Sequence, residues 1–270
     1  MSTPPEIYIN VDYPMYKALI TDIDATIVEI SSNGNDIDKA TIDTVRLAQS
    51  QRFKIACATG RGWPSTEPVV ERLGLIDPCI IEGGSRIINP VDGKTIWEKF
   101  LDINASREVL KVFRKFAVGK ELIKSTSNPD RIPIKEALEM TSKNRIIYLL
   151  GTDAEPANNI ISVLVTTGLA AAYKTTPSWC GEKLYDIHVT HPDATKKNAI
   201  LTWYRLTGIF PAETIGLGDS ENDVSLFESV GFSVAVGNAT NSLKQLANHI
   251  SPTQKEGALQ YVIETFLLKQ

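Results

Sequence analysis

Cysteine is scarce in this sequence, and its scarcity excludes two ways of stabilising a fold. Only three cysteines, Cys57, Cys79 and Cys180, occur among 270 residues. They are too few and too scattered for a disulfide framework or a CxxC metal site. Since Cys57 and Cys79 lie within apolar runs, we expect three reduced thiols, two of them in the core.

Long runs of one residue type are also missing. The 28 basic and 32 acidic side chains form no basic blocks, which argues against a nucleic-acid partner. There is no N-terminal apolar leader, and the segment ISVLVTTGLAAAY (161–173) is too short and too often interrupted by threonine to cross a membrane. We therefore expect a soluble, cytoplasmic protein without a membrane partner. The sequence leaves the oligomeric state open.

Apolar segments alternate with amphipathic ones towards both ends of the chain. Strands are predicted at 17–21, 53–60, 78–84, 214–218 and 232–237, and helices at 38–50, 66–73, 195–207, 222–229, 242–248 and 257–268. This alternation is typical of an α/β fold whose parallel sheet is covered on both faces. The hydrophobic fraction of 43% is sufficient for such a core.

The pattern changes to hairpins in the middle of the chain. The segment SRIINPVDGKTIWEKF (85–100) has Asp92 and Gly93 at a predicted turn, and RIIYLL, LAAAYKT and LYDIHVT are predicted strands among helices near 107–116 and 157–167. The α/β alternation then returns. We predict a Rossmann-like parallel core formed by residues 1–85 and 188–270, with an inserted α+β cap domain at 86–187.

Polar side chains follow three of the predicted core strands. In chain order they are Asp22 and Asp24, then Thr59, then Asp219, Asn222 and Asp223. Ligands of parallel α/β sheets collect outside the carboxyl ends of the strands. Carboxylates that share a pocket repel one another and stay ionised together only if a cation compensates them. Hard oxygen ligands favour Mg²⁺ as that cation.

Each of these motifs has a simpler explanation when taken alone. A DxD pair is common at the start of a turn. Asp219 or Ser220 could merely cap a helix with acidic residues in its first turn. An EF-hand is a weaker alternative, because neither acidic stretch has the required glycine and later glutamate.

The order of the motifs resembles that of the haloacid dehalogenase (HAD) superfamily of phosphatases, in particular its Cof-type branch with a large C2-type cap. The resemblance covers residues 17–87 and 186–262. It rests on DIDAT (22–26), ATGR (58–61), TKKNAI (195–200), GDSEND (218–223), VAVGNA (234–239) and KEGAL (255–259). It implies a Mg²⁺-dependent phosphatase acting on a small phosphorylated metabolite, such as a sugar phosphate or a phosphoglycolate-like acid.

The resemblance also implies catalytic roles. Asp22 would be the nucleophile that forms an aspartyl-phosphate, and Asp24 would protonate the leaving oxygen and later accept a proton from water. Lys196 would stabilise the negative charge of the transition state. The alternative for Lys196 is a solvated lysine in the first turn of a helix, a role that suits its neighbour Lys197 better.

Binding roles follow in the same way. Thr59 and the amide of Gly60 would bind the phosphoryl oxygens, and Asn222 would bind substrate or support the metal site. The implied Mg²⁺ ligands are Asp22, the backbone carbonyl of Asp24, Asp219 and Asp223.

Two positions depart from the family pattern. Ala25 stands where DxDGT has glycine, so the turn must accept a β-carbon; we expect an adjusted turn and an active protein. Gly83-Gly84-Ser85 stands where the family commonly has Asn-Gly-Ala, which removes an asparagine that could contact phosphate or the cap.

Some residues near these motifs have no assigned role. His188 and His191 lie where the insertion rejoins the core, but the aspartates already supply the acid–base chemistry, so we expect neither to be catalytic. Arg61 and Arg86 could reach a second anionic group of the substrate or could simply be surface residues.

Two other functions remain open at the level of sequence. A phosphomutase of the same fold would pass the phosphoryl group to a second hydroxyl. A non-catalytic protein would only bind a phosphorylated metabolite, although it would gain nothing from a nucleophile paired with a general acid.

Overall fold

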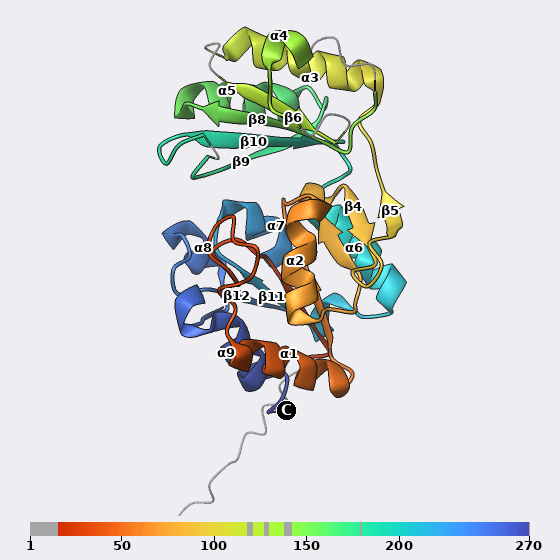
Figure 1. Cartoon of the computed structure of the whole chain (residues 1–270), viewed down its shortest axis with the longest axis vertical. Coiled ribbons are helices and arrows are strands. Elements are labelled where there is room, and N and C mark those ends of the chain that lie inside the picture. The colour runs from red at the N-terminus through yellow and green to blue at the C-terminus, as the bar shows by residue number, and fades with distance from the viewer. Residues whose placement is uncertain (1–15, 118–120, 127–129, 138–141, 179, 270) are drawn as a thin grey trace, which may run out of the picture.

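The computed structural model describes residues 16–117, 121–126, 130–137, 142–178 and 180–269. Two units are stacked along the long axis of the molecule (Figure 1). We call the elements from α3 to β10 the cap, and the remaining elements the core. The core comes from both ends of the described chain and the cap from its middle, as the sequence predicts.

The core is built around five parallel strands in the order β13-β12-β11-β1-β2. These are β1 (Ala18–Thr21), β2 (Lys54–Cys57), β11 (Thr214–Gly218), β12 (Phe232–Ala235) and β13 (His249–Ile250). Every residue of β1 and β11 is buried, as expected for central strands covered on both faces. The chain adds β2 on one side of β1 and the later strands on the other, so β1 borders the topological switch point.

Helices cover this sheet. They are α1 (Lys39–Ser50), α2 (Trp63–Leu73), α6 (Lys196–Thr207), α7 (Val224–Phe227), α8 (Asn241–Leu246) and α9 (Ala258–Phe266), with 3-10 turns at Glu82–Gly84, Pro211–Glu213, Glu221–Asp223 and Gln254–Glu256. Asp38 caps α1 by accepting a hydrogen bond from the amide of Thr41 at 2.7 Å, and Gly74 ends α2 in the left-handed conformation. The helix predicted at 222–229 is instead a 3-10 turn followed by the short α7.

A second small sheet belongs to the core. It consists of β3 (Cys79–Ile81), β4 (Arg86–Ile88) and β5 (Thr95–Glu98). A parallel bridge between Ala58 and Ile80 joins it to the end of β2. The predicted turn before β5 is confirmed by Gly93, which has a φ of 67°.

The cap is a five-stranded antiparallel sheet in the order β7-β6-β8-β10-β9. Its strands are β6 (Leu122–Ser125), β7 (Ile132–Pro133), β8 (Ile146–Thr152), β9 (Ala171–Thr175) and β10 (Tyr185–Thr190), and its helices are α3 (Ile103–Phe116), α4 (Ile134–Ala137) and α5 (Ala154–Thr166). The helices lie on the side of the sheet away from the core, so the other face of the sheet turns towards the core (Figure 1).

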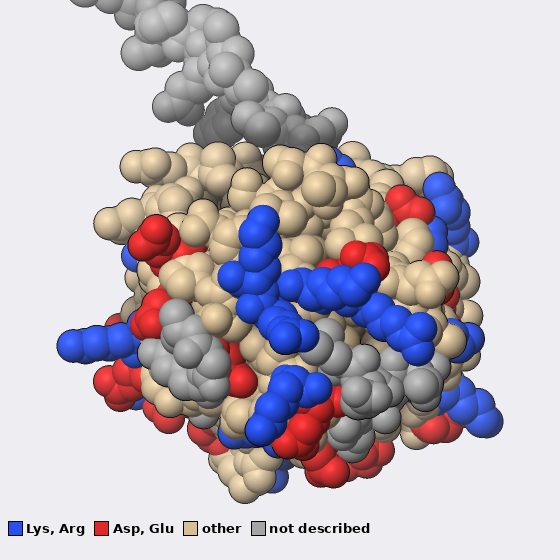
Figure 2. Space-filling view, turned by 90° about the horizontal axis from the view of Figure 1, so that it is seen from above, with Lys and Arg blue, Asp and Glu red and all other residues tan. Residues whose placement is uncertain are grey.

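The outer face of the cap carries charges of both signs, with basic side chains gathered across its middle (Figure 2). Helix α3 buries Val109, Leu110 and Phe113 against the sheet and leaves Lys111 and Arg114 exposed. This amphipathic pattern explains why the helix was predictable from the sequence.

Buried apolar side chains form two clusters. One surrounds the parallel sheet and includes Ile87 and Ile88 of β4. The other lies between the cap sheet and its helices and runs from Leu101 to Val189. The domain limits predicted from the sequence stay a prediction. We propose limits near residues 100 and 190, because β4 and β5 pack with the core.

None of the described helices is both long enough and apolar enough to cross a membrane.

Candidate active site

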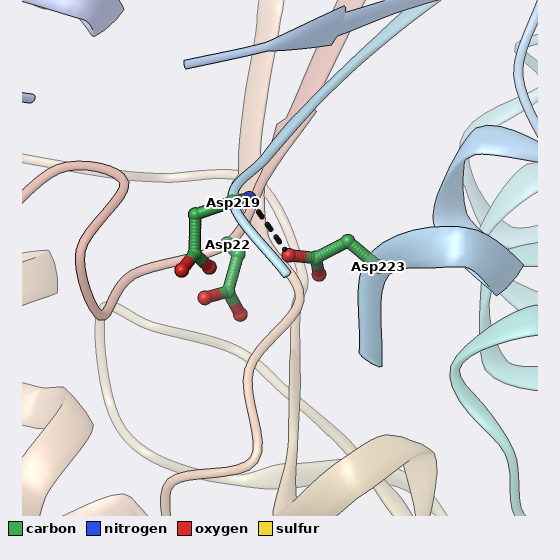
Figure 3. A group of neighbouring side chains, drawn as sticks. All are labelled: Asp22, Asp219 and Asp223. Atoms are coloured by element: carbon green, nitrogen blue, oxygen red, sulfur yellow. Dashed lines mark hydrogen bonds between the residues drawn. The ribbon is translucent and has the colours of Figure 1, made fainter. Parts of the chain in front are cut away.

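Three carboxylates from distant parts of the chain meet at the carboxyl end of the parallel sheet. Asp22 follows β1, and its amide donates to the carbonyl of Leu217 on β11 at 2.9 Å. Asp219 follows β11, and Asp223 lies in the 3-10 turn after it. Each of the three offers an oxygen within 4.8 Å of the others, and Figure 3 shows the carboxylates of Asp22 and Asp219 side by side with Asp223 approaching from a neighbouring turn. The predicted convergence of Asp22 and Asp219 is therefore confirmed.

Lys196 lies between two of these carboxylates. Its Nζ is 2.9 Å from Asp22 Oδ1 and 2.6 Å from Asp223 Oδ1, and the residue is only 4% exposed. A lysine in the first turn of a helix opposes the helix dipole, so the two carboxylates must hold it there. The alternative of a solvated lysine is wrong for Lys196. It describes Lys197, whose half-exposed side chain pairs with Glu228.

The electrostatics of this group indicate a shortage of positive charge. Burial, together with repulsion from Asp223 and Asp24, raises the pKa of Asp22 to about 7 in spite of Lys196. Burial and repulsion from Asp223 and Asp22 raise the pKa of Asp219 to about 8. Although burial alone would lower it, Asp22 and Asp223 hold the pKa of Lys196 above its ordinary value. Three carboxylates facing one lysine are a donor set that fits a hard divalent cation.

Asp219 is held in place by the residues around it. Asp223 Oδ2 accepts from the amide of Asp219 at 3.0 Å and from that of Ser220 at 3.4 Å. The hydroxyl of Thr26, the last residue of DIDAT, donates to Asp219 Oδ1 at 3.5 Å. Asn222 accepts from the Ser220 hydroxyl and lines the cavity described below. Both oxygens of Asp223 are thus engaged within the protein, which suits a supporting role.

Asp24 is paired with Arg61. Arg61 Nε donates to Asp24 Oδ2 at 2.8 Å and its Nη2 to Oδ1 at 2.6 Å. Its Nη1 donates to the carbonyls of Ser32 and Ser65. Arg61 is 8% exposed, so the alternative of a surface arginine is wrong. The side chain of Asp24 lies outside the carboxylate group around Asp22 among the described residues, which leaves its backbone carbonyl as the predicted metal contact.

The turn after β2 contains Thr59 and Gly60. The amide of Thr59 donates to the carbonyl of Ile80, and its own carbonyl accepts from Gly83, both at 3.0 Å. The amide of Arg61 donates to Thr59 Oγ1 at 3.2 Å. Thr59 is 1% exposed and lines the cavity. The structure therefore brings the predicted phosphoryl-binding turn to the same edge of the sheet as Asp22.

The two segments that depart from the family pattern both lie at tight places of the backbone, and Gly84 is the glycine that Gly83-Gly84-Ser85 shares with Asn-Gly-Ala. Ala25 adopts a φ of 54°, a left-handed conformation that favours glycine and costs a β-carbon roughly 1 kcal/mol. Gly84 has a φ of 101°, and a β-carbon there would lie 2.3 Å from the carbonyl carbon of Thr195. The second glycine of Gly83-Gly84-Ser85 thus allows the first residues of α6, and with them Lys196, to reach the site.

A cavity of about 350 Å³ lies between core and cap. The core contributes Asp22, Asp24, Thr59, Gly60, Asp219 and Asn222 to its lining. The cap contributes side chains from the open face of its sheet, among them Lys124, Tyr148 and His188. Outside this lining, Arg145 of the cap pairs with Glu82 at 2.5 Å and with Glu98 at 3.0 Å. Most of the predicted catalytic and binding residues therefore line a cavity between core and cap, whereas Lys196 and Asp223 lie outside its lining.

Of the histidines and arginines without a predicted role, some line this cavity and others lie outside it. His188 lines the cavity, and burial lowers its pKa to about 3, so it is neutral. His191 lies outside the lining and accepts from the amide of Asp193 at 3.0 Å. Arg86 also lies outside it and donates to Thr95 Oγ1. Sequence reasoning underestimated Arg61, although its place directly after Thr59 and Gly60 at a strand end was a signal.

Comparisons with known proteins agree with this geometry. A family profile described as haloacid dehalogenase-like hydrolase matches residues 19–263. Phosphoglycolate phosphatase 1 of Saccharolobus solfataricus is 22% identical to this chain, over 94% of this chain and 96% of that protein.

Solved structures show the same fold. A haloacid dehalogenase-like hydrolase from Bacteroides thetaiotaomicron superposes with a TM-score of 0.73 at 19% identity, covering 92% of this chain and 98% of that one. A sugar phosphatase of HAD subclass IIB superposes with a TM-score of 0.71 at 20% identity, covering 93% and 98%. The predicted α/β fold with its cap and the predicted HAD-type phosphatase class are confirmed, and the chain belongs to the haloacid dehalogenase-like hydrolases.

Proposed function

We propose that this protein is a Mg²⁺-dependent phosphatase that hydrolyses a small phosphomonoester through an aspartyl-phosphate on Asp22. The observation that carries the proposal is that Asp22 and Lys196, both buried, meet Asp219 at a cavity between core and cap. A purely structural ion pair would not need a third carboxylate, and placing three of them together is costly without a ligand.

The chain's own residues supply both chemical steps. In the first, a carboxylate oxygen of Asp22 bonds to phosphorus while the bond from phosphorus to the leaving oxygen breaks. Asp24, once it has taken a proton from solvent and left its pair with Arg61, gives that proton to the leaving oxygen. In the second, water attacks the phosphorus of the aspartyl-phosphate, Asp24 accepts a proton from it, and phosphate and the free Asp22 carboxylate result. Lys196 offers fixed positive charge to the transferring group, while Thr59 and the amide of Gly60 donate to its oxygens.

The carboxylates of Asp22 and Asp219, with the carbonyl of Asp24, would hold the Mg²⁺ ion, and Asp223 would support Asp219 and Lys196 from behind this group. Asn222 would support the same group or bind substrate. When bound, the ion supplies the positive charge that lets an anionic nucleophile approach an anionic ester. The raised pKa values of Asp22 and Asp219 support this assignment, because they show how poorly one lysine compensates the site.

The cavity supports a small substrate. A volume of about 350 Å³ accommodates a phosphorylated metabolite of a few carbon atoms and excludes a macromolecule. Lys124 adds positive charge to its lining, whereas Arg61 is compensated by Asp24, and this suits an anionic or hydroxyl-rich leaving group. Relatives named for phosphoglycolate and for sugar phosphates support a substrate from one of these two classes.

Phosphate release measures the proposal directly. We expect wild-type protein with Mg²⁺ to release phosphate from para-nitrophenyl phosphate and from several members of a phosphometabolite panel, with the ranking by kcat/KM giving the substrate class. Asp22→Asn should lower kcat by more than about a thousandfold. Asp43→Asn, which changes an exposed aspartate paired with Lys39, should leave kcat unchanged.

Other results would favour the alternatives. Isomerisation of a sugar phosphate that depends on an added bisphosphate would indicate a phosphomutase. Tight phosphate binding by a wild-type protein that is inert towards the whole panel would indicate a binding protein.

A further inference from the structure

Three side chains form a continuous row on the face of the cap sheet that turns towards the core. We call Tyr148, His188 and Tyr173 the aromatic row. They lie on the adjacent strands β8, β10 and β9 and are direct cross-strand partners, His188 with each tyrosine. The His188 ring lies 4.8 Å from each tyrosine ring, and its Nδ1 is 3.0 Å from the Tyr173 hydroxyl. Cross-strand packing of this kind makes the row a rigid unit.

The aromatic row contacts the core at the turn after β2. The Tyr148 hydroxyl donates to the carbonyl of Gly60 at 3.2 Å. A β-carbon on Gly60 would lie 2.8 Å from the Tyr173 hydroxyl and 3.0 Å from His188 Nδ1. All three members of the row therefore lie against this one glycine, and the Tyr148 hydroxyl makes a hydrogen bond to the core there.

That hydrogen bond acts on the turn through a planar peptide group. The carbonyl of Gly60 and the amide of Arg61 belong to the same peptide unit, so fixing the orientation of one fixes the other. The Arg61 amide donates to Thr59 Oγ1 at 3.2 Å. The Tyr148 hydroxyl is thus linked, through one rigid peptide, to the hydroxyl that would bind the phosphoryl group.

We infer that Tyr148 is a positioning residue, which orients the phosphoryl-binding turn through the carbonyl of Gly60 and does so only while the cap lies on the core. On this view the cap completes the phosphoryl site as well as covering it. The inference rests on the proposed function, because it takes Thr59 and Gly60 as the phosphoryl-binding residues.

A competing role for Tyr148 predicts a different pattern. Tyr148 also lines the cavity, so it could instead contact the body of the substrate. A leaving-group contact affects each substrate differently. A contact that orients the turn affects every substrate equally, and it also affects inorganic phosphate, which has no leaving group.

The test compares three variants that each remove one hydroxyl and keep the ring. Tyr148→Phe removes the bond to Gly60. Tyr173→Phe removes a hydroxyl of the same row that bonds within the cap. Tyr185→Phe changes a tyrosine of the cap outside the cavity lining, whose ring lies under Lys174, and serves as the control. Affinity for inorganic phosphate with Mg²⁺ is measured by calorimetry, and kcat and KM are measured with para-nitrophenyl phosphate, 2-phosphoglycolate and glucose 6-phosphate.

For Tyr148→Phe we expect phosphate affinity and kcat/KM to fall by roughly threefold to tenfold, with the same factor for all three esters. Tyr185→Phe should match wild type. Three results would overturn the inference: unchanged phosphate affinity in Tyr148→Phe, a loss that differs among the esters, or an equal loss in Tyr173→Phe. If the wild type hydrolyses no ester, the proposed function fails, while the phosphate-binding comparison still decides the role of Tyr148.

Discussion

The two sides of the cavity differ in the kind of side chain they present. The core side places charged groups at strand ends and at the start of α6, with Asp22, Asp219 and Lys196 in direct or near contact. The cap side presents chiefly neutral groups, because burial lowers the pKa of His188 and raises the pKa of both tyrosines of the aromatic row. The ion pair of the cap with the core, between Arg145 and Glu82, lies outside the cavity lining.

This difference indicates that the core carries the reacting charges, whereas the cap covers the cavity. A buried ion pair is costly to break, because each partner loses its compensation in a medium of low dielectric constant. The ion pairs of Lys196 with Asp22 and Asp223 lie wholly within the core, so they do not require a partner from the cap. The cap contributes shape, the hydrogen bond of Tyr148 and the ion pairs of Arg145.

The sharpest test of the charged side compares two neighbouring lysines. Lys196→Met should lower kcat/KM by about a hundredfold or more, since it removes the fixed positive charge beside Asp22. Lys197→Met should remain within about twofold of wild type, because its side chain is half exposed and pairs with the exposed Glu228. Steady-state kinetics on one phosphomonoester suffice. Equal losses of kcat/KM in the two variants would contradict the role assigned to Lys196.

A second comparison concerns how Lys196 reaches the site. Gly84→Ala forces a β-carbon against the Thr195 backbone, so we expect about tenfold lower kcat and about 3 kcal/mol less unfolding free energy. Gly208→Ala is the matched control, since Gly208 also has a positive φ but no atom near a β-carbon. It should cost about 1 kcal/mol and leave kcat unchanged. Urea unfolding and kinetics together measure both effects, and a Gly84→Ala protein with wild-type kcat would refute the steric argument.

Breaking the ion pair between cap and core should have a smaller effect on kinetics. Arg145→Met removes the partner of Glu82, whose side chain is 7% exposed, and should weaken cap closure by about 2 kcal/mol. We expect the weaker closure to raise KM and to change kcat little. Lys111→Met, on the outer face of the cap, should leave both constants unchanged. A fall in kcat alone would place Arg145 in the chemistry instead.

The smallest predicted effect depends on pH. Burial lowers the pKa of His188 to about 3, Lys196 adds to this and Asp24 opposes it. The open or unfolded state therefore binds a proton between pH 6.5 and 3 that the closed state does not. The stability due to neutral His188 is present above pH 6.5 and falls by about 1.4 kcal/mol for each pH unit below it.

Urea unfolding at pH 7.5 and 5.5 measures this loss. Asp22 and Asp219, whose pKa values are raised, act in the opposite sense in wild type and in both variants. His188→Gln should therefore gain about 1.4 kcal/mol of unfolding free energy relative to wild type between pH 7.5 and 5.5, whereas His191→Gln should keep the pH dependence of wild type. An unchanged slope in His188→Gln would show that another group is responsible.

Much of the core could be predicted from the sequence because its signals are local. Asp38 and Gly74 mark helix ends, and short apolar runs mark buried strands. The meeting of Asp22 with Asp219 follows from topology, since the carboxyl ends of adjacent parallel strands lie at one edge of the sheet. Lys196 could be predicted from the motif TKKNAI. Its position in the first turn of a helix gave no signal, because a lysine there is usually solvated.

The remaining features depend on contacts between distant segments. The pairing of Arg61 with Asp24 is set by the path of the intervening loop, which no local pattern encodes. The role of Tyr148 requires the register of β8 against β10 and the docking of the cap sheet. Strands β6 and β7 and helix α4 were not predicted, because each has four residues or fewer and none is a continuous apolar run like β1.

Among the described residues, the two apolar clusters share no side chain. Substitutions on the inner face of the cap sheet therefore leave the packing around the parallel sheet unchanged. Selection can alter the cap for a new metabolite one side chain at a time, provided that Tyr148 keeps its contact with the turn after β2.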